Sequence, residues 1–153
     1  MGRRDRDRLT RVYIDTNVFI YAVGGDSPYR EPSRAILRRM AERRLAGETS
    51  AYALQEMARQ RRRRGDAEMT RRIREAAALC STIHPLDWDV VATAMEVADR
   101  HPRLGVADAV HLATATQNGI ATFVSADQDM DGIPGIERVD PLDGARLAGL
   151  TSE

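Results

Sequence analysis

The chain has 153 residues, of which 42% are apolar and 30% charged, and its formal net charge is zero. This length and composition predict one globular domain and exclude an intrinsically disordered chain. No stretch approaches the roughly 20 apolar residues of a membrane-spanning helix, so no membrane association is expected. Cys80 is the single cysteine, which excludes an intrachain disulfide and favours a reducing compartment, the cytoplasm.

Positive and negative charges are separated along the chain. All 23 cationic residues are Arg. Residues 1–75 contain 19 Arg and 11 acidic residues, a net charge of +8, whereas residues 76–153 contain 4 Arg and 12 acidic residues, a net charge of −8. This asymmetry indicates a basic surface that suits a polyanion, with an acidic region elsewhere. Residues 1–10 have charge but no apolar segment, and we expect them to form a solvated arm rather than a secretory signal.

Hydrophobic periodicity and turn residues predict alternating strands and helices in the first half of the chain. These elements are a strand at 12–14, helices at about 17–23 and 31–46, a very short strand at 48–50, and helices at 51–64 and onward to 79. Gly47 is expected just after the end of the second helix, where glycine commonly terminates helices. Ser50 is expected to cap the third helix through its hydroxyl.

The second half continues this alternation. Its predicted elements are a strand at 81–84, helices at 88–100 and 106–117, strands at 121–125 and 136–139, and a small helix after Pro141. Asp87 is a predicted cap for the first of these helices. Strands that alternate with helices predict a mainly parallel sheet covered on both faces. The predicted fold class is therefore α/β, a three-layer α/β/α arrangement in which residues 1–153 form a single domain.

Four acidic residues are predicted to meet at the carboxyl edge of this sheet. Asp15 directly follows the first strand, and Asp127 follows the strand at 121–125 after one intervening residue, so both lie where open α/β sheets bind ligands. Asp108 falls in the first turn of its helix, and Glu56 lies within the third helix. Clustered carboxylates repel one another, and their oxygens are the ligands that Mg²⁺ and Mn²⁺ prefer. The pattern predicts a divalent metal site.

The segments IDTNVFIYA, GVADAVHLATA and FVSADQDMDGIPGIERVDPL, together with the helix of Glu56, resemble the PIN domain in their order and spacing. The resemblance covers residues 11–143, and the chain looks most like the toxin subunits of bacterial VapBC-type toxin–antitoxin systems. It implies a PIN-like, Rossmann-like fold and a Mg²⁺- or Mn²⁺-dependent endonuclease that cuts single-stranded RNA. It also implies a homodimer and a cognate antitoxin whose C-terminal segment occupies the active-site groove.

Carried onto this sequence, the resemblance implies roles for particular residues. The implied catalytic and metal-binding acids are Asp15, Glu56, Asp108 and Asp127. The fourth motif contains three acids, Asp127, Asp129 and Asp131, and Met130 stands where Phe is commoner; Asp127 fits the ligand position best and Asp129 is the second candidate. Thr16 or Asn17 matches a polar position that orients the site. We hypothesise that one or two metal ions activate water for attack on a phosphodiester.

The run RQRRRRG at 59–65 is the strongest basic signal. Arg59 and Arg63 follow Glu56 by three and seven residues, so they lie on its side of the helix. Arg forms bidentate contacts with phosphate, which makes both residues candidates for RNA binding. Two alternatives stay open: a solvated face that pairs with Asp66 or Glu68, and an electrostatic contact with an acidic antitoxin.

Three other residues are interpreted as structural. His111 lies three residues after Asp108, and its apolar neighbours favour a partly buried, satisfied histidine over a group that contacts a carboxylate or a water. Tyr52 and Trp88 are interpreted as core or dimer-interface residues rather than platforms for stacked bases.

Other α/β proteins with an Asp at a strand end need residues that this sequence does not have. A phosphatase of the haloacid dehalogenase type needs an Asp at position 17, where Asn stands, and a catalytic Lys, which the chain lacks. A receiver domain of two-component signalling needs an acidic pair before its strand-end Asp and also a Lys. A catalytically weak PIN-like module that binds RNA or a protein remains the open alternative.

Overall fold

The structure, a computed structural model, describes residues 9–151. Its centre is a five-stranded sheet in the order β3-β2-β1-β4-β5, in which every neighbouring pair is parallel. The strands are β1 (Arg11–Ile14), β2 (Ala46–Ser50), β3 (Thr82–His84), β4 (Thr122–Val124) and β5 (Glu137–Val139). The helices are α1 (Thr16–Val23), α2 (Arg30–Ala41), α3 (Ala51–Arg63), α4 (Met69–Leu79), α5 (Trp88–Arg100), α6 (Val106–Gln117) and α7 (Gly144–Leu150), with a 3₁₀ turn, η1, at Gln128–Met130. The predicted α/β fold with a parallel sheet is confirmed.

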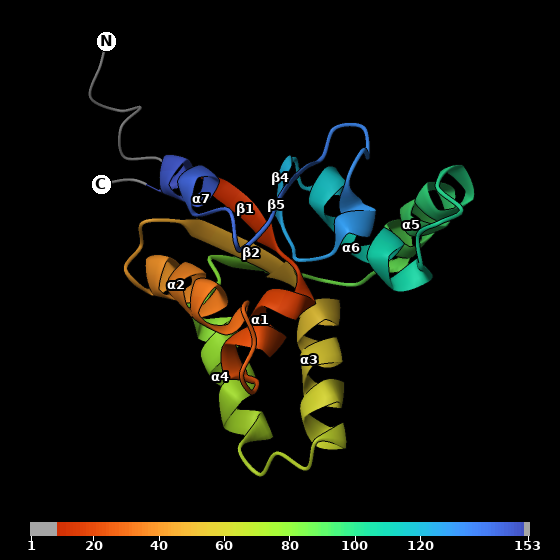
Figure 1. The fold of residues 1–153 in the computed structure, drawn as a ribbon. Helices are drawn as coiled ribbons and strands as arrows, with labels where there is room; N and C mark the ends of the chain where they lie inside the picture. The colour runs from red at the N-terminus through yellow and green to blue at the C-terminus, as the bar shows by residue number, and fades with distance from the viewer. Residues whose placement is uncertain (1–8, 152–153) are drawn as a thin grey trace.

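Alternation of side chains along the strands divides the core into two layers. Val12 and Ile14 of β1 pack with residues of α1 to α4 and α7, whereas Tyr13 between them packs with Phe123 and with residues of α6 on the opposite face. Figure 1 shows α1 to α4 gathered on one side of the sheet and α5 and α6 on the other. The molecule therefore has the three predicted α/β/α layers.

Helix α6 lies in the middle of its layer. Every residue from 109 to 115 is buried, because one side of the helix packs on the sheet and another packs on α5. The buried residues include the polar His111 and Thr114, so burial on several sides of the helix brings polar side chains into the interior as well as apolar ones. No helix among residues 9–151 is long and apolar enough to cross a membrane.

The structure corrects the boundary between the second helix and the second strand. Helix α2 ends at Ala41 instead of continuing to 46, and Arg43 adopts the left-handed conformation (φ 55°) that turns the chain. Gly47 does not terminate the helix but lies in β2, where an added Cβ would stand 2.4 Å from Cε of Met40. Any side chain at position 47 would displace the buried Met40 side chain, which packs directly on the strand.

Other local predictions agree with the structure. The Ser50 hydroxyl accepts a hydrogen bond from the Ala53 amide at 2.9 Å, and the Asp87 carboxylate accepts one from the Val90 amide at 3.0 Å, so both cap their helices. The predicted N-terminal arm falls largely outside the described residues. At its end, the Thr10 carbonyl accepts a hydrogen bond from the Ala46 amide, which extends the contact between β1 and β2.

Candidate active site

The candidate site lies at the carboxyl edge of the sheet, next to β1. The chain passes from β1 to β2 on one side and returns to β4 on the other, so β1 is the point at which the strand order reverses. Ligands of open α/β sheets bind at such switch points. Asp15 directly follows β1, and Ser125 directly follows β4, which brings residues 110 positions apart in sequence into contact.

Asp15 is buried and held on both of its carboxylate oxygens. Its Oδ1 accepts a hydrogen bond from the Thr16 amide at 2.7 Å, at the N-terminus of α1. Its Oδ2 accepts hydrogen bonds from the Ser125 hydroxyl at 2.7 Å and from Asn17 Nδ2 at 3.2 Å. The positive end of the helix dipole and these donors stabilise a buried negative charge at a fixed position.

Asn17 and Ser125 connect the Asp15 side of the site to the Asp127 side. Asn17 Nδ2 donates to the Ser125 hydroxyl oxygen at 3.0 Å, and Asn17 Oδ1 accepts from the Ala126 amide. The same Ser125 oxygen accepts a hydrogen bond from the Asp127 amide at 3.0 Å. Sequence reasoning missed Ser125, although a small polar residue directly after a buried strand was a signal that could have identified it.

Glu56 of α3 reaches the site from the opposite side. Its Oε1 accepts hydrogen bonds from Thr16 Oγ1 at 2.8 Å and from His111 Nε2 at 2.6 Å. Burial alone would raise the pKa of Glu56, but the hydrogen bonds from His111 and Thr16 outweigh it and lower the pKa. Glu56 is therefore an ionised carboxylate at neutral pH.

His111 contacts a carboxylate, contrary to the expectation of a merely satisfied core histidine. The residue is fully rather than partly buried, and its Nε2 faces Glu56 and also lies 3.6 Å from Asp15 Oδ1, while its Nδ1 lies 2.7 Å from the Tyr13 hydroxyl. Burial would lower the pKa of His111, but the hydrogen bond to Glu56 and the charge of Asp15 outweigh it and raise the pKa. The imidazole thus bridges two of the four predicted acids.

Asp108, Asp127 and Asp129 form a second group of carboxylates beside Asp15. One oxygen of each residue lies within 4.8 Å of an oxygen of the others. Burial and then repulsion from Asp127 and Asp15 raise the pKa of Asp108 to about 6. Three carboxylate oxygens at this spacing, on groups that destabilise one another when ionised, fit a hard divalent cation that prefers oxygen ligands.

The two candidate positions of the fourth motif are distinguished by their surroundings. Asp127 lines the cavity and accepts a hydrogen bond from the Asp129 amide, whereas Asp129 is exposed at the rim. Asp131, the third acid of the motif, points elsewhere and pairs with Arg138 at 2.6 Å. The structure therefore brings Asp127 and Asp129 toward Asp108 and leaves Asp131 outside the group.

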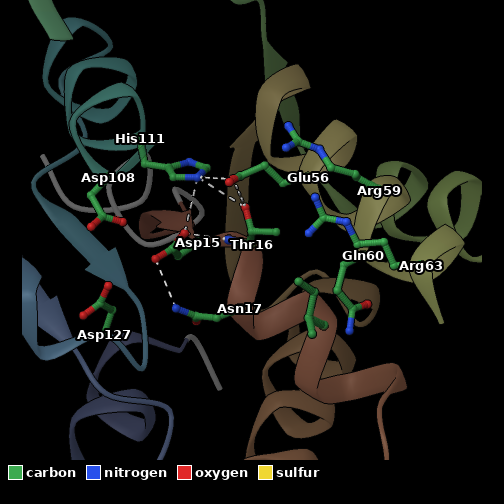
Figure 2. Close-up of a pocket in the computed structure, with 11 residues that line it drawn as sticks. Asp15, Thr16, Asn17, Glu56, Arg59, Gln60, Arg63, Asp108, His111 and Asp127 are labelled. Atoms are coloured by element: carbon green, nitrogen blue, oxygen red, sulfur yellow. Dashed lines mark hydrogen bonds and ion pairs between the residues drawn. The ribbon is translucent and has the colours of Figure 1, made fainter. Parts of the chain in front are cut away.

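A cavity of about 300 Å³ joins these groups. Its lining residues are Asp15, Thr16, Asn17, Ile20, Glu56, Arg59, Gln60, Arg63, Asp108, His111 and Asp127. Figure 2 shows Asp108 and Asp127 on one side of Asp15, with Arg59 and Arg63 of α3 on the other. The arrangement combines oxygen ligands for a cation with guanidinium groups for anions in one opening.

The sequence left open that Arg59 and Arg63 form ion pairs with Asp66 or Glu68. These two acids do form ion pairs, but with other arginines. Asp66 forms ion pairs with Arg61 and Arg72 at 2.9 Å, and Glu68 pairs with Arg71 at 2.5 Å. Arg59 and Arg63 instead line the cavity.

The two aromatic residues interpreted as core or interface residues lie in different surroundings. Tyr52 is partly buried and packs against the His111 ring, with the ring centroids 5.4 Å apart. Trp88 is 75% exposed at the start of α5 and is therefore not a core residue.

Comparison with known proteins agrees with this geometry. The PIN domain profile matches residues 12–136. The chain belongs to the PIN domain family. It is 33% identical over 124 residues to ribonuclease VapC23 of Mycobacterium tuberculosis, an alignment that covers 78% of this chain and 94% of the relative. It is 29% identical over 150 residues to ribonuclease VapC7 of the same organism, covering 93% of this chain and 99% of the relative.

Solved structures with low sequence identity share the fold of this PIN domain. FitAcB from Neisseria gonorrhoeae superposes with a TM-score of 0.66 at 19% identity, covering 86% of this chain and 99% of that one. A chain of a toxin–antitoxin complex from Klebsiella pneumoniae superposes with a TM-score of 0.64 at 21% identity, covering 85% and 97%. The M. tuberculosis toxin VapC20 superposes with a TM-score of 0.62 at 18% identity, covering 82% and 98%.

Proposed function

We propose that this PIN domain is a Mg²⁺- or Mn²⁺-dependent endonuclease that cuts single-stranded RNA and acts as the toxin of a toxin–antitoxin pair. The observation that carries the proposal is one cavity lined by Asp15, Glu56, Asp108, Asp127 and two arginines, with the exposed Asp129 in the same carboxylate group as Asp108 and Asp127. The relatives named ribonuclease VapC23 and ribonuclease VapC7 support the reaction class.

In the proposed mechanism, each part of the cavity has its own task. The cation would be held by Asp15, Asp108, Asp127 and Asp129. Glu56 adds a further carboxylate to the lining of the same cavity. When bound, the cation would supply Lewis-acid chemistry that polarises a phosphodiester and lowers the pKa of a water molecule. Thr16 and His111 hold Glu56, and Asn17 and Ser125 hold Asp15, while Arg59 and Arg63 bind RNA phosphates next to the bond that is cut.

The proposal extends to partners and location. Solved complexes of similar fold are described as toxin–antitoxin or VapBC complexes, which supports a cognate antitoxin for this chain. Exposed apolar side chains at Ile83, Leu86 and Trp88 support a homodimer. The single free cysteine supports action in the reducing cytoplasm.

The test is RNA cleavage by purified protein that has been stripped of metal and of any partner. We expect cleavage of a mixed single-stranded RNA pool when Mn²⁺ or Mg²⁺ is added, and none with EDTA. The Asp15→Asn variant should lose at least about 10²-fold in rate, because the neutral amide removes a negative oxygen ligand from the acidic centre. It should stay folded, because the side chain is isosteric, its remaining oxygen can still accept from the Thr16 amide, and the Ser125 hydroxyl can turn its hydrogen away from the new NH₂ group; circular dichroism checks this.

The Asp15→Asn sample also controls for a contaminating nuclease, which the substitution would leave unchanged. Equal cleavage by the variant and the wild type would contradict the proposed site. A folded protein that binds Mn²⁺ and RNA without cutting any RNA in the pool would instead support the catalytically weak binding module.

A further inference from the structure

The loop between β4 and β5 carries two of the acids in the carboxylate group. Asp127 and Asp129 stand at the start and in the middle of the short η1 turn, and Asp129 is exposed. A three-residue 3₁₀ turn has little intrinsic stability. Repulsion among the three carboxylates favours movement of this loop away from Asp108, so other contacts must hold the loop in place.

Arg138 of β5 makes those contacts. Its Nη1 donates to the Ser125 carbonyl at 2.9 Å, immediately before the loop acids. Its Nε and Nη2 donate to the two oxygens of Asp131 at 2.6 and 3.3 Å, immediately after them. Nη1 also donates to Asp140 at 3.1 Å. One guanidinium group thus forms hydrogen bonds with the residues that precede and follow Asp127 and Asp129 in the chain.

The surroundings of Arg138 suit this task. Its side chain is only 11% exposed, its bonds to Ser125 and Asp140 are partly buried, and its planar fork serves three acceptor residues at fixed angles. Arg103, which precedes α6, donates a further hydrogen bond to the Asp131 carbonyl. The loop end at Asp131 is therefore held by two cations that belong to separate parts of the fold.

We propose that Arg138 is a positioning residue that holds Asp127 and Asp129 in the geometry needed to bind a divalent cation. This inference rests on the proposed metal-dependent function but concerns a residue that touches neither the cation nor the substrate. Arg138 acts by reducing the number of loop conformations, so that less conformational entropy is lost when the cation binds.

The test measures Mn²⁺ affinity directly, by isothermal titration calorimetry on the full chain, with no RNA present. We expect Arg138→Met to weaken Mn²⁺ binding by about 10-fold or more, the range found when groups that orient metal ligands are lost. Arg138→Lys should bind more weakly than wild type but more tightly than Arg138→Met, because an ammonium group keeps the charge and loses the fork. At saturating Mn²⁺ the cleavage rate of both variants should return toward the wild-type rate.

The matched control is Arg146→Met. It removes an ion pair of 2.6 Å between Arg146 and Glu137, the residue directly before Arg138 in β5, and the same single positive charge. We expect wild-type Mn²⁺ affinity from this variant. Equal Mn²⁺ affinity in Arg138→Met and wild type would overturn the proposal, and so would equal weakening in Arg138→Met and Arg146→Met.

A second variant guards against a failure of Arg138→Met to fold. Asp131 is 57% exposed, so Asp131→Asn is tolerated by the core while it weakens the Arg138 contact. We expect about a threefold loss of Mn²⁺ affinity, smaller than for Arg138→Met because the Ser125 carbonyl contact remains. An unchanged affinity in a folded Asp131→Asn protein would contradict the role of this contact. Wild-type protein that bound no Mn²⁺ would instead contradict the metal site itself and hence the proposed function.

Discussion

Burial and the carboxylates of Asp127 and Asp15 raise the pKa of Asp108 to about 6, against an ordinary value near 3.8. A carboxyl group whose pKa is higher in the folded protein contributes stability below its ordinary pKa and loses that contribution as the pH rises through the folded value. We therefore expect the Tm of the metal-free protein to fall between pH 4 and pH 7 relative to that of Asp108→Asn. Thermal unfolding of the two proteins over this range, in EDTA, measures the effect.

Saturating Mn²⁺ provides the control for Asp108. A bound cation compensates the repulsion among the carboxylates, so the pH-dependent difference between wild type and Asp108→Asn should shrink or reverse sign in its presence. Parallel Tm curves for the two metal-free proteins would show that Asp108 does not experience this repulsion.

Single residues also show how far the site could be predicted from the sequence. The positions of Asp15 and Asp127 could be predicted because strand ends set them, and the strands themselves were predicted from apolar runs. The contact between His111 and Glu56 could not be predicted, because it depends on the angle and distance at which α6 and α3 lie on either side of β1. The apolar neighbours of His111 correctly indicated burial, but burial says nothing about which polar partner satisfies a side chain.

At the scale of elements, the C-terminal boundary of α2 also could not be predicted from local sequence, because tertiary packing sets it. The periodicity of apolar residues continues to Leu45, but the chain leaves the helix at Ala41 so that Leu45 and β2 can enter the core. Tertiary burial overrides helical spacing over these few residues. In contrast, the caps of α3 and α5 depend only on Ser50 and Asp87 and their nearest neighbours, and both were predicted correctly.

Helix α3 presents Glu56, Arg59 and Arg63 to one cavity, which leads to a prediction about RNA binding. For single-stranded nucleic acid, each lost phosphate contact changes the slope of log affinity against log salt by about 0.7. We expect Arg59→Ala with Arg63→Ala to flatten this slope by about 1.4. The measurement is RNA affinity at several salt concentrations, with Asp15→Asn present in all proteins to prevent cleavage.

The control for α3 removes two charges from another helix. Arg38→Ala with Arg39→Ala in α2 lowers the net charge equally but leaves the cavity lining unchanged. Its salt slope should stay close to that of the parent. If both double variants changed the slope by the same amount, net charge rather than contact with the cavity would determine RNA affinity.

At the scale of the whole molecule, the fold turns the charge asymmetry of the sequence into a spatial one. The basic half of the chain, residues 1–75, supplies β1, β2 and the helices from α1 to α3, whereas the acidic half supplies α5, α6, β4 and β5. The candidate site lies where the two halves meet, with Arg59 and Arg63 from the first half and Asp108 and Asp127 from the second (Figure 2). Under the proposed function, this division separates the phosphate-binding arginines from two of the cation-binding carboxylates within one opening.

The proposed homodimer can be tested at the exposed apolar residues near the edge strand β3. Ile83, Leu86 and Trp88 are 39%, 43% and 75% exposed. In a two-fold dimer the same patch on each protomer faces its copy, so a charge introduced there is desolvated twice and meets its own image. We expect wild-type protein to sediment as a dimer and Trp88→Asp as a monomer, with unchanged helix content by circular dichroism. Leu142→Asp, at a 50% exposed residue in the turn before α7, should remain dimeric; equal dissociation of both variants, or of neither, would locate the dimer interface elsewhere.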